Sequence, residues 1–591
     1  MPRRLAVAAL FLSLVAAMPH AARADDAPTN VELVWGVKVP MRDGVSLNAT
    51  VYKPRSKADP QPVIFTLTPY IGDSYHDRAM YFASHGYVFA LVDARGRGSS
   101  GGTFEPFANE PHDGYDVCEW LAKQPYCNGK VAMWGGSYAG YDQWATLKEA
   151  PPHLATIVPA AAAHAGYDFP FFQNVFSTYV IQWLTFTSGV TPNAKLFGDG
   201  KFWSEVFYEW YQSETPFAEL DARAGNMTSV FQKWLQHPTP DAYWDAMAPT
   251  PDQYRKMNIP ILTITGHYDG DQPGALHYYR QFMQYASPEA RAHHYLIIGP
   301  WDHAGTRTPN KEVGGLTFGD ASVLDLNSLH KQWYDWTMKG GPKPEFLKKS
   351  VAYYVVGPEQ WKYADSLESV SNATRTLYLG SADGKANDVF RSGTLGDAAG
   401  GGAATDTFVY DPLDKRPGTL EHDSSGDTGY LLDQTAVQNL FGTGVVYTSE
   451  PFSADTEVSG PISVSAWLSM DVPDTDLFAS LYEVRKDGSC IQLTNDVKRA
   501  RYRESLREAK LVPPGEIIEY RFDTFSWFSR RIAKDSRLRL VIGCTNSVSL
   551  EKNFNGGGVV ANESGKNART AHVTLYHDAT HKSALVLPIV R

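Results

Sequence analysis

Short runs of consecutive apolar residues recur along the first part of the chain, with helical periodicity between them. The apolar runs are Val63–Thr68, Val88–Asp93, Val131–Trp134, Ile261–Thr265 and Tyr295–Ile298. The helical segments are Asp77–His85, Asp113–Lys123, Tyr138–Glu149, Pro273–Tyr285 and Val323–Met338. Strands buried on both faces appear as continuous apolar runs, and intervening helices indicate a parallel sheet covered on both sides. The pattern predicts an α/β domain formed by residues 25–166 and 256–348.

Two other regions break this alternation. Residues 167–255 combine helical periodicity with many Trp and Phe side chains, which predicts a helical cap inserted into the α/β domain. From residue 349 to 591 the chain consists of short segments of period two, such as Leu477–Val484 and Leu538–Gly543, separated by turn residues. Such segments are typical of an antiparallel sandwich or jelly roll. The predicted fold class is therefore α/β with a helical insertion and a C-terminal β jelly roll.

The first 24 residues have the pattern of a signal peptide. Arg3 and Arg4 precede the apolar run Leu5–Ala17, which is too short to span a bilayer, and Ala-Arg-Ala at 22–24 fits a cleavage site. An N-terminal anchor helix is the alternative. We expect residues 1–24 to be removed and the protein to be exported, either to a periplasm or out of the cell.

The composition is that of a soluble globular protein, with 43% hydrophobic and 20% charged residues among 591. The formal net charge is −11 at pH 7, and loss of the arginine-containing leader would make the chain more acidic still. A chain this acidic, with no basic cluster, is poorly suited to bind nucleic acid or an anionic membrane. Neither nucleic acid nor a membrane is therefore an expected partner, and the oligomeric state stays open.

Four cysteines would meet oxidising conditions in an exported protein, where disulfides form. Four cysteines allow three pairings. We expect Cys118–Cys127, which are close in sequence, and Cys490–Cys544, which would join two strands of the C-terminal domain. Four buried free thiols are the alternative. No Cys or His spacing predicts a zinc site, and neither a metal nor an organic cofactor is expected.

The segment 131–140, with the sequence VAMWGGSYAG, is the strongest local indication of chemistry. An apolar strand runs into a tight Gly-x-Ser turn and a helix leaves it, which is the pattern of a nucleophile elbow. Gly135 and Ala139 are small enough to let strand and helix approach, although the usual second glycine comes one position late, at Gly140. The pattern predicts Ser137 as a nucleophile, and a tight structural turn is the alternative.

A serine nucleophile needs a base, and the base needs a partner that orients it. After a nucleophile elbow the chain order is Asp or Glu and then His, each in a loop that follows a strand. Asp269 follows the strand at 261–265 and His303 follows the strand at 295–298. We therefore predict that Ser137, Asp269 and His303 meet at one edge of the sheet. The rivals for the last two roles are His267, His293, His294, Asp271 and Asp302.

An oxyanion hole needs donors that point at the developing negative charge. One predicted donor is the backbone N–H of Tyr138, directly after the nucleophile. The other is expected in the loop after the strand at 63–68, where Tyr70 offers a hydroxyl group. The alternative for Tyr70 is an aromatic ring packed in a loop.

Several motifs together resemble one family of serine hydrolases. The matching segments are Val39–Leu47, Asp93–Gly101, Gly135–Gly140, Tyr268–Gly270, Gly299–His303, Pro473–Asp476 and Arg537–Arg539. They are similar to the cocaine esterase/X-prolyl dipeptidyl peptidase-like hydrolases, which include the α-amino acid ester hydrolases and glutaryl acylases. The resemblance implies an α/β-hydrolase fold with a helical cap and a C-terminal jelly roll. It also implies Ser137, Asp269 and His303 as the triad, with Tyr70 and the Tyr138 amide as the oxyanion hole.

The resemblance also bears on substrate binding. The amino acid ester hydrolases bind the ammonium group of their substrate with a carboxylate cluster. Two members of that cluster follow the triad aspartate at the second and third positions, which here are Asp271 and Gln272. Asp168, just before the predicted cap, is a candidate for another member. The resemblance thus implies a partial cluster in which Asp271 is retained, and Asp168 is the candidate for a second acid.

These features lead us to expect an exported serine hydrolase that cleaves ester or amide bonds of small acyl substrates through an acyl-enzyme. An enzyme resembling an α-amino acid ester hydrolase or acylase fits this description. Two alternatives stay open. The first is an X-Pro dipeptidyl aminopeptidase, and the second is a secreted carbohydrate-binding protein whose hydrolase unit is a relic.

Overall fold

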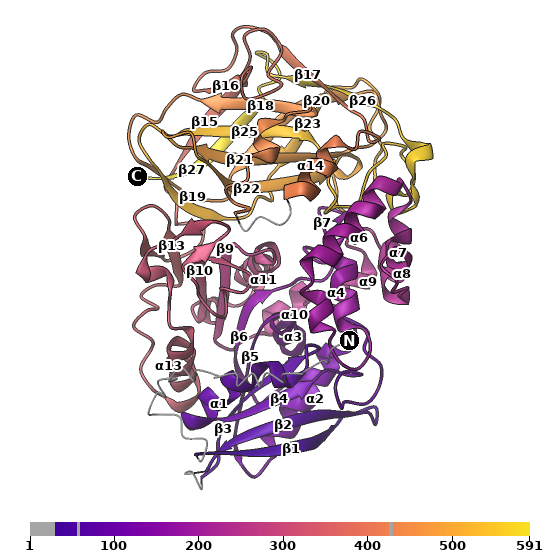
Figure 1. The fold of residues 1–591 in the computed structure, drawn as a ribbon. Helices are drawn as coiled ribbons and strands as arrows, with labels where there is room; N and C mark the ends of the chain where they lie inside the picture. The colour runs from indigo at the N-terminus through magenta and orange to yellow at the C-terminus, as the bar shows by residue number, and fades with distance from the viewer. Residues whose placement is uncertain (1–29, 56–58, 425–428) are drawn as a thin grey trace, which may run out of the picture.

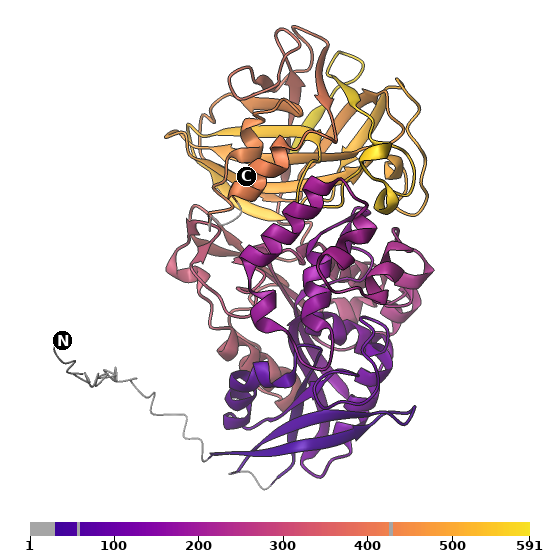
Figure 2. The same ribbon diagram turned by 45° about the vertical axis from the view of Figure 1, so that its right-hand side comes forward.

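The structure is a computed structural model that describes residues 30–55, 59–424 and 429–591 (Figure 1). The predicted signal peptide, residues 1–24, lies outside the described residues. The chain forms an α/β part, a set of helices inserted into it, and a C-terminal β domain. Figures 1 and 2 show the β domain stacked on the α/β part, with inserted helices reaching from the α/β part to the β domain.

A ten-stranded sheet forms the centre of the α/β part. Its spatial order is β1 (Val31–Pro40), β2 (Ser46–Pro54), β4 (Val88–Asp93), β3 (Gln61–Thr68), β5 (Cys127–Ser137), β6 (Leu154–Ala162), β9 (Ile261–Tyr268), β10 (His294–Asp302), β13 (Val351–Val355) and β14 (Gln360–Ala364). The strands from β4 to β13 run parallel, whereas β1, β2 and β14 pair antiparallel with their neighbours. All five predicted apolar runs lie within strands of this parallel region.

Helices cover both faces of this sheet, as the apolar strands require. The helices are α1 (His76–Ser84), α2 (Glu110–Ala122), α3 (Tyr138–Lys148), α11 (Gln272–Tyr285), α12 (Pro288–Arg291) and α13 (Leu326–Lys339). One core packs α2, α3 and α11 against the sheet, and a second core packs α1 and α13 against its other face. Within the described segments, no helix combines the length and apolar character needed to cross a membrane.

The structure differs from the sequence prediction at two places in this sheet. The strand β6 was not expected, because Ala and Pro contribute five of its nine residues and both are poor strand formers. Strands β13 and β14 lie beyond residue 349, where the C-terminal domain was expected to begin, yet they extend the ten-stranded sheet. β13 pairs parallel with β10, so the α/β part continues to Ala364.

The segment between β6 and β9 is helical apart from one small hairpin, β7 (Phe171–Phe172) and β8 (Val175–Phe176). Its helices are α4 (Tyr179–Thr187), α5 (Ala194–Phe197), α6 (Gly200–Ser213), α7 (Leu220–Arg223), α8 (Ser229–Leu235), α9 (Ala242–Asp245) and α10 (Pro251–Lys256). We call residues 167–255 the helical insertion. Its tryptophans are buried in one core that it shares with the α/β part, which contributes Tyr138 and Tyr141, and with the C-terminal domain, which contributes Val548. The tryptophans are Trp183, Trp203, Trp210, Trp234 and Trp244.

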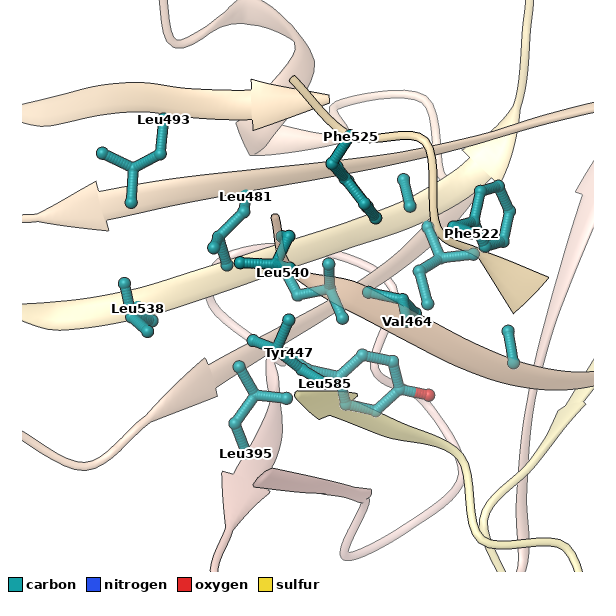
Figure 3. Close-up of a cluster of buried hydrophobic side chains, with 14 of the residues drawn as sticks. Leu395, Tyr447, Val464, Leu481, Leu493, Phe522, Phe525, Leu538, Leu540 and Leu585 are labelled. Atoms are coloured by element: carbon teal, nitrogen blue, oxygen red, sulfur yellow. The ribbon is translucent and has the colours of Figure 1, made fainter. Parts of the chain in front are cut away.

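The C-terminal β domain is almost wholly antiparallel. Its strands are β15 (Ala373–Gly380), β16 (Gly393–Gly396), β17 (Thr405–Tyr410), β18 (Gly444–Ser449), β19 (Thr456–Gly460), β20 (Ser463–Met470), β21 (Asp476–Val484), β22 (Cys490–Arg499), β23 (Ile518–Phe522), β24 (Phe528–Ile532), β25 (Arg537–Cys544), β26 (Ala571–Tyr576) and β27 (Ala584–Val590). Two short helices, α14 (Arg416–Ser424) and α15 (Thr435–Gln438), join them, and two-residue strands β11 (Glu312–Val313) and β12 (Leu316–Thr317) pair in the preceding part. Alternate side chains of these strands form one apolar core, part of which is shown in Figure 3.

The two expected disulfides are not formed, and all four cysteines are buried free thiols. Cys490 and Cys544 lie on opposite sides of β21 and pair with its two ends, Val484 and Leu477. Seven residues of extended strand span roughly 23 Å, far beyond the reach of a disulfide. Cys118 faces the core from α2, while the sulfur of Cys127 accepts a hydrogen bond from the backbone of the following turn. The thiols fill space in the cores instead.

Candidate active site

The turn between β5 and α3 holds Ser137 in an unusual backbone conformation, with φ 63° and ψ −128°. Few side-chain-bearing residues adopt such angles, and they persist where the surrounding structure enforces them. A Cβ atom on Gly135 would lie 2.7 Å from Ala139 Cβ, and one on Gly140 would lie 2.8 Å from Ala160 O. The second glycine therefore comes one position late because α3 packs there against β6. The predicted strand, sharp turn and helix are confirmed.

His303 and Asp269 form a hydrogen-bonded pair in the loops that follow β10 and β9. The distance from His303 Nδ1 to Asp269 Oδ1 is 2.8 Å. The other carboxylate oxygen accepts a hydrogen bond from Thr265 Oγ1 at 2.9 Å, and the backbone N–H of Asp271 donates to Oδ1 at 3.1 Å. Because Asp269 engages Nδ1, Nε2 is the nitrogen of His303 that can act on a substrate or a serine.

Ser137, Asp269 and His303 line the same cavity, as their order along the chain predicted. Each stands at the carboxyl end of its parallel strand, and those ends lie at one edge of the sheet. Ser137 Oγ lies within hydrogen-bonding distance of Tyr70 Oη, at 3.4 Å. The arrangement thus brings a hydroxyl group, an imidazole and a buried carboxylate to one wall of the cavity.

The rival residues have other roles. His294 begins β10, at the end of the strand away from His303, and its Nε2 shares a hydrogen bond with Thr263. His267 is buried against the Trp527 ring, and burial lowers its pKa to about 3. Asp302 accepts a hydrogen bond from the Gly305 backbone and so stabilises the turn that carries His303. His293 precedes β10 and is likewise far from this edge.

The charges around His303 raise its pKa above the usual value. Burial is the largest influence and lowers the pKa, and Arg307 also lowers it, but Asp271 and Asp269 outweigh both. Asp271 Oδ2 lies 3.7 Å from His303 Nδ1. Burial in turn raises the pKa of Asp271 to about 6. The imidazolium form is therefore well supported at this site, which is what a base that accepts a proton during a reaction requires.

Tyr70 is placed to donate a hydrogen bond into the cavity. It follows β3, and its Oη accepts a hydrogen bond from Trp183 Nε1 at 3.1 Å. Because the indole is the donor in that bond, the phenol proton of Tyr70 is free for another acceptor. Burial raises the pKa of Tyr70, so the hydroxyl keeps its proton.

Tyr138 begins α3 and is held by its own side chain. Its hydroxyl donates to Glu110 Oε1 at 2.6 Å and accepts a hydrogen bond from the Phe107 backbone at 2.6 Å. These hydrogen bonds hold Tyr138 in place, and its backbone N–H is the predicted oxyanion donor directly after Ser137. Sequence reasoning identified Tyr138 by its place in the elbow but did not identify Glu110, which lies 28 residues earlier.

Asp271, which the resemblance implied, and Asp168, the candidate for a second acid, both line the cavity. The two oxygens of Asp168 accept hydrogen bonds from the backbones of His164 and Gly274, at 2.7 and 2.6 Å. Burial, together with the nearby Asp271, raises the pKa of Asp168 well above its usual value. Ionising both Asp168 and Asp271 is costly because their negative charges repel each other. A cation bound between them would stabilise the ionised forms.

Gln272, which stands where the related enzymes have an acid, faces away from this pair. Its Nε2 donates to Gly266 O and to Trp527 O, both at 2.8 Å, and its Oε1 accepts from the backbone N–H of Trp527 at 2.5 Å. The amide therefore connects the loop that carries Asp269 to the C-terminal domain. Only an amide can both donate and accept in this way.

The cavity has a volume of about 850 Å³ and is built by all three parts of the molecule. The α/β part supplies the residues described above, and the helical insertion supplies Phe169, Tyr179 and Trp183. The C-terminal domain supplies a third wall, which includes Phe441, Phe478, Tyr482 and Gln492. Sequence reasoning missed this third wall, because a period-two pattern does not tell which strands will border another domain. Across the described chain, no group of three or more His, Cys, Asp or Glu side chains is arranged to hold a metal ion.

Comparison with known proteins agrees with this architecture. Residues 43–305 match the profile of the X-Pro dipeptidyl-peptidase (S15 family), and residues 344–586 match that of the X-Pro dipeptidyl-peptidase C-terminal non-catalytic domain. The chain belongs to the cocaine esterase/X-prolyl dipeptidyl peptidase-like family. Family members are esterases and peptidases, so the protein is a hydrolase of this kind. The cocaine esterase of Rhodococcus sp. (strain MB1 Bresler) is 28% identical over 592 residues, which cover 95% of this chain and 99% of the esterase.

Solved structures show the same fold. An aminopeptidase from a marine sediment Thaumarchaeota archaeon has a TM-score of 0.82 and 22% identity, with 97% of this chain and 99% of that chain covered. An α-amino acid ester hydrolase has a TM-score of 0.80 and 20% identity, with 98% and 100% covered. At these identities the likeness establishes the shared fold.

Proposed function

We propose that the protein cleaves esters or amides of small acyl substrates through a covalent acyl-enzyme on Ser137. Ser137 Oγ attacks the substrate carbonyl carbon while its proton passes to His303 Nε2. Asp269 keeps the imidazole oriented and stabilises its positive charge, and Tyr70 Oη and the Tyr138 N–H bind the oxyanion. The bond to the leaving group then breaks as His303 returns the proton to it. Water repeats the sequence and releases the acid.

One observation carries this proposal. A serine in a strained elbow, a hydrogen-bonded His303–Asp269 pair and the Tyr70 hydroxyl converge on one cavity. Labelling with a fluorophosphonate tests it, because the reagent loses fluoride as its phosphorus bonds to an activated serine oxygen. We expect one label per chain in the wild type and none in Ser137→Ala. A wild type that stays unlabelled would overturn the proposal and favour a binding protein with a relic hydrolase unit.

We further propose a preference for substrates with an ammonium group next to the acyl carbonyl. The pair Asp168 and Asp271 supports it, since both line the cavity and a bound cation would favour their ionised forms. Gln272 is turned away from the cavity, so the site has fewer acids than the cluster of the α-amino acid ester hydrolases. The preference should therefore be modest. Cleavage after X-Pro is the alternative, in which proline forms the acyl position and the ammonium group to be bound lies one residue further from the scissile carbonyl.

Two assignments complete the proposal. We assign the helical insertion the role of a cap over the site and the C-terminal domain a jelly-roll architecture, which the mostly antiparallel pairing supports. We also infer export to a periplasm or out of the cell, on the basis of the sequence at residues 1–24. Mass spectrometry of the protein purified from its native host would test export, with a mature N-terminus at residue 25 as the expected result.

A further inference from the structure

The wall that the C-terminal domain contributes to the cavity is one face of the strands β21 and β22. Residues Phe478, Ser480 and Tyr482 alternate along β21 and all line the cavity. Successive residues of a strand point to opposite faces, so these three share a face. On β22 the partners Gln492, Asn495 and Val497 line the cavity as well. The register shift beside Leu481 keeps both sets on that face.

The polar groups of this wall are available for a ligand. Gln492 lies opposite Tyr482 and Asn495 opposite Ser480. In the described chain, neither side-chain amide makes a hydrogen bond, although the backbone N–H of Gln492 donates to Leu431 O. Thr545 Oγ1, which also lines the cavity, is buried without a partner. Gln492 is half-buried, whereas Asn495 is exposed and can bind water when the cavity is empty. Buried and half-buried polar groups normally find partners, so the unpaired groups of Gln492 and Thr545 beside a cavity indicate a missing ligand group.

The nearby carboxylate, in contrast, is already engaged. Asp496 Oδ1 accepts from Thr524 Oγ1 and from the Val497 backbone, and its Oδ2 accepts from the Thr524 backbone. Asp496 also lines the cavity, but three hydrogen bonds already occupy it. The unpaired groups on the alternating face of the two strands are uncharged amides and hydroxyls. They alternate with the flat rings of Phe478 and Tyr482, which suits a flat group that also forms hydrogen bonds.

The position of the wall relative to His303 indicates which part of a substrate it meets. The leaving group must lie on the side of His303, because this residue protonates it. The loop that carries Asp269 is joined to Trp527 of the C-terminal domain by the hydrogen bonds of Gln272. The strand β22 contacts the segment directly before Trp527, because Thr494 Oγ1 donates to Ser526 O. The opposite side, around Tyr70, is lined by Trp183 of the helical insertion.

From these observations we propose that the β21–β22 face is a leaving-group subsite. It accepts an uncharged leaving group that combines a flat apolar surface with an amide or hydroxyl group, which Gln492 and Asn495 bind. This inference rests on the proposed acyl-enzyme function and adds the class of leaving group to it. It gives the domain described as non-catalytic in the family a direct part in substrate selection.

Two esters with the same acyl group test this subsite. The acyl group is the one that the wild type cleaves fastest as its 4-nitrophenyl ester, and the leaving groups are 4-acetamidophenol and 4-isobutylphenol, which are similar in size. We expect the wild type to favour the acetamido ester by about 10-fold in kcat/KM. Gln492→Leu and Asn495→Leu should each lower kcat/KM for the acetamido ester by about 2- to 10-fold, the effect of one hydrogen bond. Both variants should leave kcat/KM for the isobutyl ester within about 2-fold of the wild-type value.

The rate of deacylation separates this role from acyl binding. Both esters give the same acyl-enzyme, so its hydrolysis should be unchanged in the two variants. The matched control is Gln332→Leu, which alters an exposed glutamine on α13, far from the cavity. Three results would each overturn the subsite. The wild type could show equal kcat/KM for the two esters, the variants could lose kcat/KM equally on both, or the variants could deacylate more slowly. Fluorophosphonate labelling of Ser137 would persist in all those cases, whereas its absence would overturn the acyl-enzyme itself.

Discussion

The hydroxyl of Tyr70 lies 3.4 Å from the hydroxyl of Ser137 and receives a hydrogen bond from the indole of Trp183. Tyr70 comes from the α/β part and Trp183 from the helical insertion. The insertion thus orients a donor of the α/β part toward the serine. An aromatic residue packed in a loop, the alternative for Tyr70, would not need this hydrogen bond.

Tyr70→Phe keeps the ring and removes one donor. Loss of one oxyanion donor lowers kcat by about 10²- to 10³-fold, or roughly 3–4 kcal/mol in the barrier. The loss should fall on kcat rather than KM, because the oxyanion forms mainly in the transition state. Steady-state kinetics on an aryl ester measures both. A change confined to KM would mean that Tyr70 packs against the substrate and does not bind the oxyanion.

The pH dependence of activity reports the protonation of His303. Only the neutral imidazole can accept the serine proton, so kcat/KM should rise with pH through the pKa of His303. The carboxylates raise that pKa, which places the rise above the usual value of about 6.5. Asp271→Asn removes one of these charges and should move the rise to lower pH. A flat profile between pH 5 and 8, or a shift to higher pH in the variant, would contradict the role of His303.

Asp271→Asn also tests the preference for an ammonium group. We expect the wild type to favour α-amino acyl esters over their des-amino analogues by about 10-fold, or ~1.4 kcal/mol, and the variant to lose this preference. Both esters are compared within each protein at one pH near neutrality, where the substrate amine is charged and both esters meet His303 in the same protonation state. A neutral aryl ester serves as the control and should be hydrolysed nearly as before. Equal wild-type rates for the two ester types would leave a general carboxylesterase.

Gln272→Glu restores the acid of the related enzymes and should destabilise the protein. The carboxylate cannot donate to Gly266 O and Trp527 O, and it would be buried among acceptors. We expect a loss of about 3 kcal/mol in stability, since a buried charged group without a partner costs more than a neutral one. The midpoint of urea unfolding measures it, with the exposed Gln332→Glu as control. Unchanged stability together with a stronger ammonium preference would show that residue 272 can turn into the cavity.

Local patterns were sufficient to predict the centre of the site. The strand, turn and helix around Ser137 lie within ten residues, and Asp269 and His303 each follow an apolar strand that the sequence marks clearly. Parallel strands bring their carboxyl ends to one edge, so order along the chain was enough to bring these residues together. Tyr70 could be located in the same way, because it follows β3.

The features that could not be predicted depend on contacts between residues that are distant in sequence. Gln272 meets Trp527 across 255 positions, and nothing near either residue indicates the pairing. The strand β6 contains helix-forming alanines, and its neighbours β5 and β9 in the sheet override that preference. Cys490 and Cys544 could be assigned to strands but not to opposite ends of β21. For the same reason, the cavity face of β21 and β22 could not be distinguished from a face buried in the core.

The central claim is that Ser137 carries the acyl group, and its most direct test is the turnover of Ser137→Ala on an ester that the wild type hydrolyses. Thermal unfolding should confirm that the variant is folded, since removal of one hydroxyl group leaves the packing of the elbow intact. Because the members of a triad act as a unit, we expect kcat to fall by about 10⁴-fold or more. A folded Ser137→Ala that retains more than a tenth of the wild-type activity would contradict the assignment.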